Sequence, residues 1–547
     1  MSFSIYNSSA VPVETKGSAK RRVLYIKHRR KIAVSDAFRL NQDEWIEAMS
    51  IHADVFLAET SFDLYEACDR IRPDFILYES PSLFPEPLEI SNPKAHPNIP
   101  RIAFQMQDPY CSTRVSFLRT IEELGVKWIF THMPELALRQ SPELRLRTFS
   151  VSHMFDENLF KDYGLKKDIP VSVFGGFLVP EIYNWRAEIA DKLPHRFPTF
   201  IYTHPGYKAP VPKHKFPVYG EAYARLLNRS HFSLADTTRF DCFLRKHLEI
   251  PASGAVLIAP NTPALKPYGF NDMENCILGT GDELFDKMAA VADDPDMYER
   301  IRTSGYNLVH GKYGRSKWTG ILDFYECLAG LKPGQTIRQE GLFGRFYIVP
   351  EDNTCAPAID AHYPDSEVSA LAKMWLNALA TGEGIDEIMS KTSRLCGWMA
   401  NMTEYWVPMG VFAMLKGDLE TAKKCLLTPH KIRQTESGFE EYDPEEIAWL
   451  SLAAALSGDK QVMLMTKKES AHMRHLSLRR MEWLGYVSAS GSSMESGDIP
   501  EKVQRRLTDD HMSIHWTGQM EMRDWLKLIR RVLDANGQAG IRLPSFQ

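Results

Sequence analysis

The sequence predicts an α/β protein in which two doubly wound domains stand in tandem and a mainly α-helical domain follows them. Three observations support this prediction. Short apolar runs alternate with amphipathic stretches as far as about residue 331, the strand signal then fades, and a helical pattern continues from about residue 358. Buried strands that alternate with helices are typical of a parallel sheet covered on both faces.

Composition and charge are those of an ordinary globular protein. The 547 residues correspond to three or four domains of roughly 150 residues each. With 65 Lys and Arg against 70 Asp and Glu, the net charge is −5, which gives no general attraction to nucleic acid or to an anionic membrane. We therefore expect no nucleic-acid partner.

Neither the N-terminal segment nor the cysteines indicate export. Residues 1–20 are polar and Ser-rich, which predicts a short disordered lead-in and no signal peptide. No apolar run approaches the roughly 20 residues that cross a bilayer, so we expect no transmembrane segment. The eight cysteines show no CxxC and no zinc spacing, which fits free thiols in a reducing compartment. We predict a cytoplasmic protein, and a peripheral position at the inner membrane face stays open.

The first α/β domain is predicted to span residues 21–166. Its apolar and β-branched runs have the length of buried strands, and the segments between them have helical spacing. The expected strands are Val23–Ile26, Asp54–Leu57, Asp74–Tyr78, Arg101–Phe104 and Lys127–Phe130, and the expected helices are Asp43–Ser50, Ser61–Ile71 and Arg114–Leu124.

The second α/β domain is predicted to span residues 167–331 and to follow the same alternation. Apolar residues recur at spacings of three and four around residues 182–193, 221–228, 284–291 and 318–325, which predicts a helix in each segment. The expected strands are Val171–Phe174, Thr199–Thr203 and Ala255–Ala259.

Residues 332–357 are predicted to be a linker, and residues 358–547 a helical domain. Within that domain AMLKGD and AALSGD end at Gly417-Asp418 and Gly458-Asp459, which lie 41 residues apart. Each Gly-Asp pair would form a turn between two helices, which is compatible with helix-hairpin repeats. An irregular helical domain is the equally weighted alternative.

Ligands of doubly wound domains bind beyond the carboxyl ends of the strands, so we look there for chemistry. The sequence contains no GxGxxG, no GxxxxGK(S/T), no HExxH and no GxSxG. Dinucleotide dehydrogenases, P-loop NTPases, zinc proteases and α/β hydrolases therefore lose their main support.

The most informative stretch is DCFLRKHLEIPASGAVLI, residues 241–258. In it Glu249 stands eight residues after Asp241 and belongs to LEIPASG, which precedes a buried strand. This stretch resembles the acid-x7-acid element of retaining GT-B glycosyltransferases, and more closely that of their spore-maturation-type (CgeB-like) branch. The resemblance implies two Rossmann-like domains, retention of anomeric configuration and no required metal.

The resemblance also assigns roles to the two acids. Glu249 falls on the acid that holds the ribose hydroxyls of the donor. Asp241 falls on the first acid, close to the donor sugar, at a position where the family usually has Glu. A carboxylate can accept bidentately from the two neighbouring hydroxyls of a ribose, so the physical chemistry agrees with the role given to Glu249.

Four further residues of this stretch are candidates for the donor's diphosphate. Arg245 and Lys246 would neutralise the negative charge that grows on the leaving nucleoside diphosphate. A solvated helix face is the alternative for this basic run. A helix N-terminus at residues 251–254 would present the N–H groups of Ser253 and Gly254 to the same diphosphate.

Other segments follow in the order of the same family. Residues 152–156 with Phe160 resemble the PxGxD…F segment that closes the first domain. His310 and Arg315, five residues apart, resemble the terminal H-T-x-x-x-R element. The resemblance covers roughly residues 21–330 and leaves the helical region outside it.

Two pairs of residues are additional donor-binding candidates. Residues 269–276, GFNDMENC, resemble the segment that covers the donor sugar, so Asp272 and Asn275 would bind sugar hydroxyls; a surface turn is the equally weighted alternative. His204 and Lys208 follow a predicted strand, in a segment between Lys192 and Gly220 that contains basic residues and no acid. A basic loop would complement a diphosphate, with a solvated Pro-rich loop as the alternative.

The acceptor side is expected on loops that follow strands of the first domain. Asp108 is the candidate base for the acceptor hydroxyl, although Gln107 stands where related enzymes have the His of a His-Asp pair. Glu79 is the rival candidate. The basic run at residues 27–31 could grip an anionic acceptor, or could be a solvated turn.

The leading hypothesis is a glycosyltransferase that moves a sugar from a nucleotide-diphosphate sugar, with UDP among the candidate nucleotides, to a hydroxyl of a glycan, lipid-linked or protein acceptor. It implies no cofactor beyond the donor itself and no metal. The alternative is a catalytically degenerate GT-B scaffold that binds a ligand while its helical domain recruits a protein partner. An epimerase or phosphorylase of similar architecture is a third interpretation.

Overall fold

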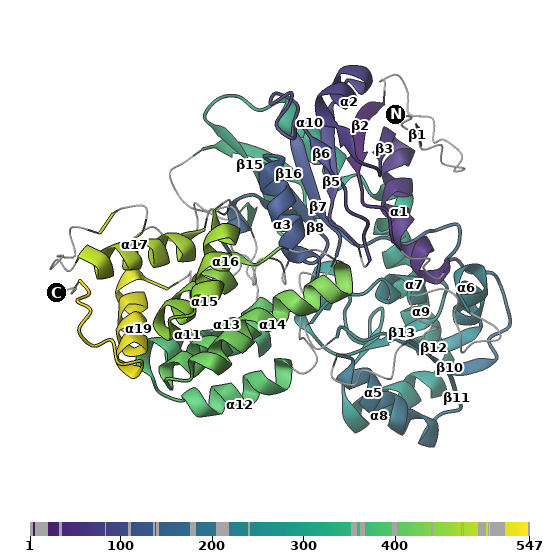
Figure 1. The fold of residues 1–547 in the computed structure, drawn as a ribbon. Helices are drawn as coiled ribbons and strands as arrows, with labels where there is room; N and C mark the ends of the chain where they lie inside the picture. Colours follow the sequence, from purple (N-terminus) through teal and green to yellow (C-terminus); the bar gives the residue numbers. More distant parts are fainter. Residues whose placement is uncertain are drawn as a thin grey trace.

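Two large, mainly parallel β-sheets, two smaller sheets and a cluster of helices make up the structure, a computed structural model (Figure 1). The residues that it describes are 4–5, 20–31, 36–82, 84–107, 111–134, 137, 142–175, 182–203, 218–238, 241–351, 358–360, 367–396, 402–438, 441–471, 473, 475–490, 499–500, 503 and 520–544.

The first sheet has seven strands in the order β1-β3-β2-β5-β7-β8-β9, and all neighbours except β1 and β3 are parallel. All five strands predicted here are confirmed, because buried parallel strands are apolar throughout. Helix α1 covers one face, and α2 and α3 cover the other. The elements are β1 (Ser4–Ile5), β2 (Arg21–Ile26), α1 (Asp36–His52), β3 (Ala53–Ala58), α2 (Leu64–Ile71), β5 (Phe75–Glu79), β7 (Arg101–Gln105), α3 (Arg114–Glu123), β8 (Trp128–Thr131) and β9 (Thr148–Ser150).

Strand β1 lies within the segment for which the sequence predicted disorder. Its two residues pair with β3 in antiparallel fashion at the edge of the sheet. Two short elements, β4 (Phe62–Asp63) and β6 (Ile90–Ser91), pair with each other beside this sheet, and a 3-10 turn, η1 (Pro142–Leu146), precedes β9.

The second sheet is parallel throughout, in the order β11-β10-β12-β13-β14. The three predicted strands are confirmed. Sequence analysis missed β12 (Ser230–Leu234), whose serines interrupt its apolar pattern, and the two-residue β14 (Ile277–Leu278). The remaining elements are β10 (Ile169–Gly175), α5 (Asn184–Lys192), η2 (Leu193–His195), β11 (Thr199–Thr203), α6 (Gly220–Arg229), α7 (Lys246–Ala252), β13 (Val256–Ala259), η3 (Pro263–Tyr268), α8 (Gly281–Asp293) and α9 (Pro295–Lys312).

After α9 and η4 (Arg315–Lys317) the chain returns to the first sheet. Helix α10 (Gly320–Ala329) packs Ile321 and Phe324 against that sheet, in one apolar cluster with Trp45 of α1. By its packing, α10 therefore belongs to the first sheet, although the sequence analysis placed it in the second domain. The parallel α/β layout is confirmed, whereas the division into tandem domains stays a prediction.

Two strands of a small sheet lie in the predicted linker, and the third follows just after it. Strand β15 (Gln335–Glu340) pairs antiparallel with β16 (Phe346–Pro350) and parallel with β17 (Ile359–Asp360). The Gln339 side chain fixes this sheet to β9, because its amide oxygen accepts from the N–H of Ser150 at 2.8 Å. The segment is thus an ordered bridge along its described residues.

The remaining helices pack around one apolar core and lie to one side of both sheets (Figure 1). Asp418 and Asp459 cap the helices that follow the two Gly-Asp turns, as the sequence suggested, although a helical repeat stays a prediction. The helices are α11 (Glu367–Thr381), α12 (Ile385–Cys396), α13 (Thr403–Leu415), α14 (Leu419–Ser437), α15 (Pro444–Ser457), α16 (Lys460–Ser470), α17 (Leu476–Ser490) and α19 (Met522–Ala535).

The helical region contacts both sheet-bearing parts of the chain. Cys242 is buried in its core, and Met133, which follows β8, packs against that core. The Ser116 hydroxyl at the start of α3 donates to Glu441 at 3.0 Å. These helices therefore form part of one compact assembly with the two sheets.

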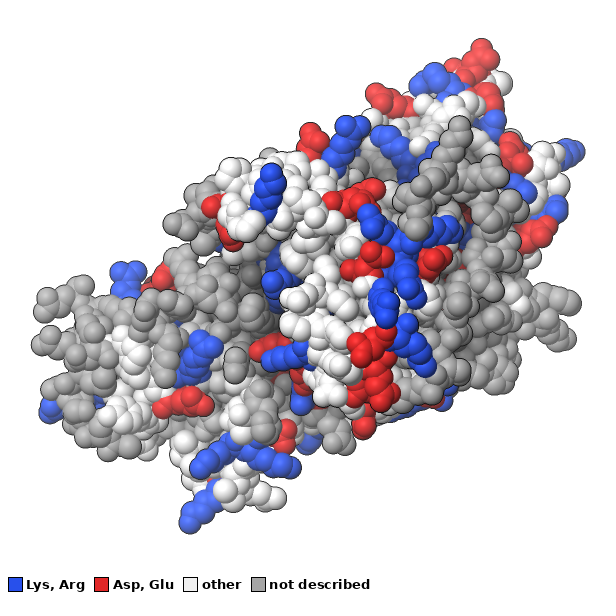
Figure 2. Space-filling view, turned by 90° about the horizontal axis from the view of Figure 1, so that it is seen from above, with Lys and Arg blue, Asp and Glu red and all other residues white. Residues whose placement is uncertain are grey.

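Lys and Arg side chains are interspersed with Asp and Glu on the described surface seen in Figure 2, in keeping with the small net charge of −5. Within the described part of the chain, no helix combines the length and apolar character needed to cross a bilayer.

Candidate functional site

A cavity of about 140 Å³ lies where α1 of the first sheet faces α7 of the second. One part of its wall is charged and comes from both sides: Glu44, Glu47, Asp156, Arg245, Lys246, Glu249 and Arg315. Another part is aromatic and comes from the second sheet and its neighbouring segments: Phe160, Phe174, Tyr202, Tyr219 and Tyr223.

Glu249 lies in the first turn of α7 and lines this cavity, as the sequence analysis required. Its side chain is 8% exposed, and its Oε1 lies 3.3 Å from Nη2 of Arg245, four residues earlier. A carboxylate that is this buried and still borders open space can accept hydrogen bonds from a ligand. The ribose role itself stays a prediction.

Arg245 and Lys246, the two predicted diphosphate cations, stand at the start of α7 and also line the cavity. Arg245 Nη2 lies 2.6 Å from Glu44 Oε2, so this guanidinium joins α7 to α1. Lys246 Nζ donates to the carbonyl of Phe174 at the end of β10, at 2.7 Å. Burial, with a smaller contribution from Arg186, lowers the pKa of Lys246 to about 7.

Two acids on α1 were missed by the sequence analysis. Glu44 has a 7% exposed side chain, and burial raises its pKa to about 7 although Arg245 acts to lower it. Glu47 contacts Arg315, whose Nη2 also lies 3.2 Å from Asp156. The motif matches contained Asp156 and Arg315 without giving them roles; nothing local marked Glu44 or Glu47, since acids three apart on a helix are usually solvated.

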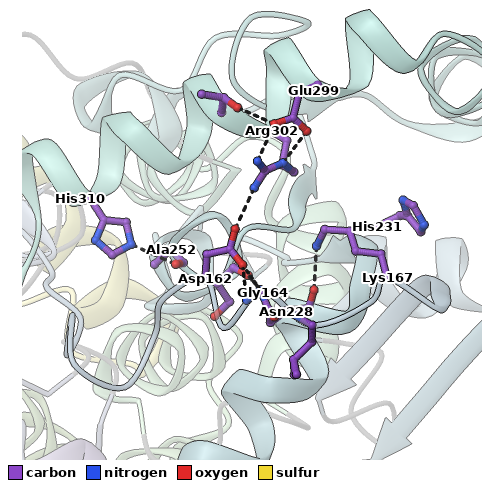
Figure 3. A network of polar contacts seen from close by, with 12 residues as sticks. Asp162, Gly164, Lys167, Asn228, His231, Ala252, Glu299, Arg302 and His310 are labelled. Atoms are coloured by element: carbon purple, nitrogen blue, oxygen red, sulfur yellow. Dashed lines mark hydrogen bonds and ion pairs between the residues drawn. The ribbon is translucent and has the colours of Figure 1, made fainter.

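A polar network behind α7 fixes the position of this helix (Figure 3). Asn228 donates to the carbonyl of Ser253 and to Asp162, both at 2.9 Å. Arg302 Nη1 lies 3.5 Å from the same Asp162, and His310 Nε2 lies 3.0 Å from the carbonyl of Ala252. The C-terminal end of α7 is thus anchored to α6 and α9, which orients its first turn toward the cavity.

The expectation that residues 251–254 begin a helix is wrong. They end α7: the N–H of Ser253 donates to the carbonyl of Glu249, and that of Gly254 to Pro251. Gly254 has φ +76°, a left-handed conformation that favours glycine after a helix. Both N–H groups are thus bonded within the end of α7, Ser253 and Gly254 are absent from the described lining of the cavity, and their contact to a diphosphate stays a prediction.

Asp272 and Asn275 stabilise their own loop and are also absent from the described lining. Asp272 pairs with Lys287 at 2.8 Å and accepts from the N–H of Leu278 at 2.8 Å. Asn275 accepts from the N–H of Asn271 and donates to the carbonyl of Gly269, each at 2.9 Å. Both side chains are thus engaged within their own loop, in which Asn275 is buried, and their predicted contacts to a donor sugar stay predictions.

Asp241 lies before α7, in a left-handed conformation with φ +58°. It is not one of the described residues that line the cavity. Its predicted role beside the donor sugar stays a prediction. Asp108, His204 and Lys208 lie outside the described residues, so their predicted roles stay predictions.

Glu79 and the basic run at residues 27–31 meet at the carboxyl ends of β5 and β2. Glu79 is buried and accepts from the hydroxyl of Tyr25, and burial raises its pKa. Lys27 pairs with Asp43 of α1 at 2.9 Å. Within this closed cluster Lys27 is buried, so the solvated-turn interpretation does not hold for it.

Among the described residues, no group of three or more His, Cys, Asp or Glu side chains could hold a metal ion. Metal independence of the reaction stays a prediction, because it concerns the chemistry of the bound donor.

Comparison with known proteins gives distant similarities. None of the curated proteins matches the chain. Among solved structures, a glycosyltransferase from Rickettsia africae ESF-5 is 10% identical, with 58% of this chain and 100% of that chain covered and a TM-score of 0.38. Sucrose-phosphate synthase from Thermosynechococcus elongatus is 10% identical over 57% and 100%, with a TM-score of 0.40. Anabaena HepE in complex with UDP and glucose is 11% identical over 57% and 100%, with a TM-score of 0.35.

A family model gives a more local result. Residues 159–319, which hold the second sheet, α7 and much of the cavity wall, match the family described as glycosyl transferase-like.

Proposed function

We propose that this protein is a glycosyltransferase that moves a sugar from a nucleotide-diphosphate donor to a hydroxyl acceptor. The observation that carries the proposal is the meeting of Glu249, Arg245 and Lys246 in one cavity between the two sheets. These three residues were assigned to the donor from their sequence alone. The glycosyl transferase-like match over residues 159–319 supports the same class of reaction.

The two parts of the cavity wall suit the two ends of a nucleotide. Aromatic rings such as Tyr202 and Tyr223 offer faces on which a base can stack. Glu249 would accept from the ribose hydroxyls, and Arg245 and Lys246 would receive the diphosphate. The donor would thus lie with its base toward α6 and its sugar toward α1.

Lys246 would contribute to bond breaking more than to binding. Breaking the bond at the anomeric carbon builds negative charge on the diphosphate, so a cation nearby stabilises the transition state more than the ground state. Because the pKa of Lys246 is about 7 in the empty cavity, an approaching diphosphate favours its charged form.

The finer assignments belong to the same proposal. The LEIPASG match to the spore-maturation-type branch supports retention of configuration without a metal. The acceptor would be a hydroxyl of a glycan, a lipid-linked glycan or a protein, and its base would come from Asp108 or Glu79. A soluble or peripherally attached enzyme fits each acceptor class.

Release of nucleoside diphosphate from UDP-, GDP-, ADP- and TDP-sugars tests the proposal. We expect release from one donor by the wild type and at least a tenfold loss in Glu249→Ala. Glu188→Ala is a matched control, because Glu188 also pairs with a cation four residues away but is 55% exposed on α5. Tight donor binding without any release would instead favour the scaffold alternative, and free sugar or sugar phosphate would favour an epimerase or a phosphorylase.

A further inference from the structure

Two carboxylates of helix α1 line the cavity, and the cations with which they pair belong to other segments of the chain. Glu44 and Glu47 are three residues apart and so share one face of α1. Glu44 Oε2 lies 2.6 Å from Arg245 Nη2, and Glu47 contacts Arg315. Two ion pairs therefore connect α1 to the segments that carry the donor site.

The Glu44–Arg245 pair uses a cation that the proposed function gives to the diphosphate. Among the described residues, Arg245 is the one ion-pair partner of Glu44. A diphosphate carries more charge than a carboxylate and presents several oxygens to a guanidinium, so it competes well for Arg245. A carboxylate that loses its cation in a buried place and gains an anionic neighbour favours its protonated form.

We propose that Glu44 is the internal counter-ion of Arg245 in the empty cavity, and that a nucleoside diphosphate displaces it and leaves it protonated. The inference rests on the proposed function and names Glu44 as a residue that, in addition to Lys246, makes donor affinity depend on pH. Binding of the donor is then accompanied by uptake of a proton at a carboxyl oxygen of Glu44.

The surroundings of Glu44 agree with this assignment. Burial raises its pKa to about 7 even while Arg245 lowers it, and Glu249 and Asp156 raise it further. His132 and His153, on which the charge of Arg245 also acts, stay neutral because burial lowers the pKa of each below its ordinary value. The titratable and charged groups that line the cavity with Glu44 are Glu47, Asp156, Tyr223, Arg245, Lys246, Glu249 and Arg315.

The sign of the pH dependence follows. Below pH 7 most of Glu44 is already protonated in the empty cavity, so binding requires no proton. Above pH 7 the ionised carboxylate must take up a proton when the diphosphate binds, which weakens affinity by about tenfold per pH unit. In Glu44→Gln no proton has to be taken up at this position, so this loss of affinity is absent at every pH.

The test is calorimetric titration of wild type and Glu44→Gln with UDP, or with the first of GDP, ADP and TDP that binds. We expect a wild-type Kd close to that of Glu44→Gln at pH 6 and about tenfold weaker at pH 8. Titration of the nucleotide itself affects both proteins equally and cancels in the ratio. In Glu47→Gln, whose partner Arg315 is not assigned to the diphosphate, the ratio to wild type should be the same at both pH values.

A second measurement covers the case in which Glu44→Gln does not fold. Lys246→Arg keeps Glu44 and carries a cation that does not titrate, so UDP binding at pH 8 should still take up close to one proton, measured in buffers of different ionisation enthalpy. No uptake, or a Kd ratio that does not change with pH, overturns this inference alone. Absence of binding by all four nucleotides overturns the proposed function and this inference with it.

Discussion

Two buried Arg–Glu groups in this protein have the same chemistry and different surroundings. Inside the helical region, Arg433 donates to both carboxylate oxygens of Glu446, at 2.9 and 2.7 Å, and the side chains are 4% and 0% exposed. Beside the cavity, Arg245 is shared between Glu44 and Glu249, and all three border open space. The first group holds helices together, whereas the second can exchange a carboxylate for a ligand.

Burial costs free energy for the charges of both groups. The difference between them therefore lies in their surroundings. Removing one partner of a fully buried pair leaves a charge that no other ion compensates. Next to a cavity, a second carboxylate, water or a ligand can take the vacant place. Whether a buried ion pair only stabilises the fold or can also take part in binding therefore depends on whether it borders a cavity.

Arg433→Met should give the largest effect in this comparison. It leaves Glu446 buried without its cation, so we expect a loss of about 3–5 kcal/mol of stability in the helical region. The urea midpoint of that region's unfolding measures it. The double variant Arg433→Met with Glu446→Leu should recover most of the loss; a double variant as unstable as the single one would contradict this explanation.

Acidification should act on both regions through buried histidines, of which one in each region is compared. Burial lowers the pKa of His475 in the helical region and of His247 in α7 to about 4. Since the unfolded chain binds these protons below about pH 6.5 and the folded chain does not, stability is full above pH 6.5 and falls toward pH 4, by about 2 kcal/mol per histidine at pH 5. Melting curves of wild type, His475→Gln and His247→Gln between pH 7 and 5 measure the loss. Equal slopes in all three would contradict it.

Glu249→Ala should weaken UDP-sugar binding by more than tenfold, because a buried contact from a carboxylate to ribose hydroxyls is worth about 1.5–3 kcal/mol. Its effect on stability should be smaller than that of Arg433→Met, since Arg245 keeps Glu44 as a partner. Calorimetry and urea unfolding of the same samples separate the two quantities. Unchanged affinity would remove the ribose role of Glu249.

Lys246→Ala should produce the smallest change in binding and a larger one in turnover. The cation acts on charge that develops during bond breaking, so kcat should fall by a greater factor than donor affinity. Steady-state kinetics together with calorimetric Kd values distinguish the two. Equal losses would mean that Lys246 binds ground state and transition state alike.

The strands and the charged residues at the start of α7 could be predicted because each is marked by a pattern of neighbouring residues in the sequence. Apolar runs such as Val23–Ile26 identify buried strands, and Arg245, Lys246 and Glu249 fall within five consecutive residues. The direction of α7 was not predictable in the same way. Residues 251–254 were expected to begin a helix, whereas Pro251 lies inside α7, near the end of that helix.

Other features depend on contacts between distant segments. Glu44 looks like one acid on an amphipathic helix until α1 is placed against α7, 200 residues further along the chain. The return of α10 to the first sheet and the clamp between Gln339 and Ser150 are likewise tertiary. A linker composition rich in Gly, Pro and Gln concealed strand β15, although its Ile337 is buried.

A crystal structure of the protein with UDP would test the central claim most directly. We expect the uridine ribose within hydrogen-bonding distance of Glu249, the diphosphate on Arg245 and Lys246, and Glu44 released from Arg245. Ordered UDP at any other place, with the Glu44–Arg245 pair intact and the cavity empty, would contradict the assignment of this cavity to the sugar donor.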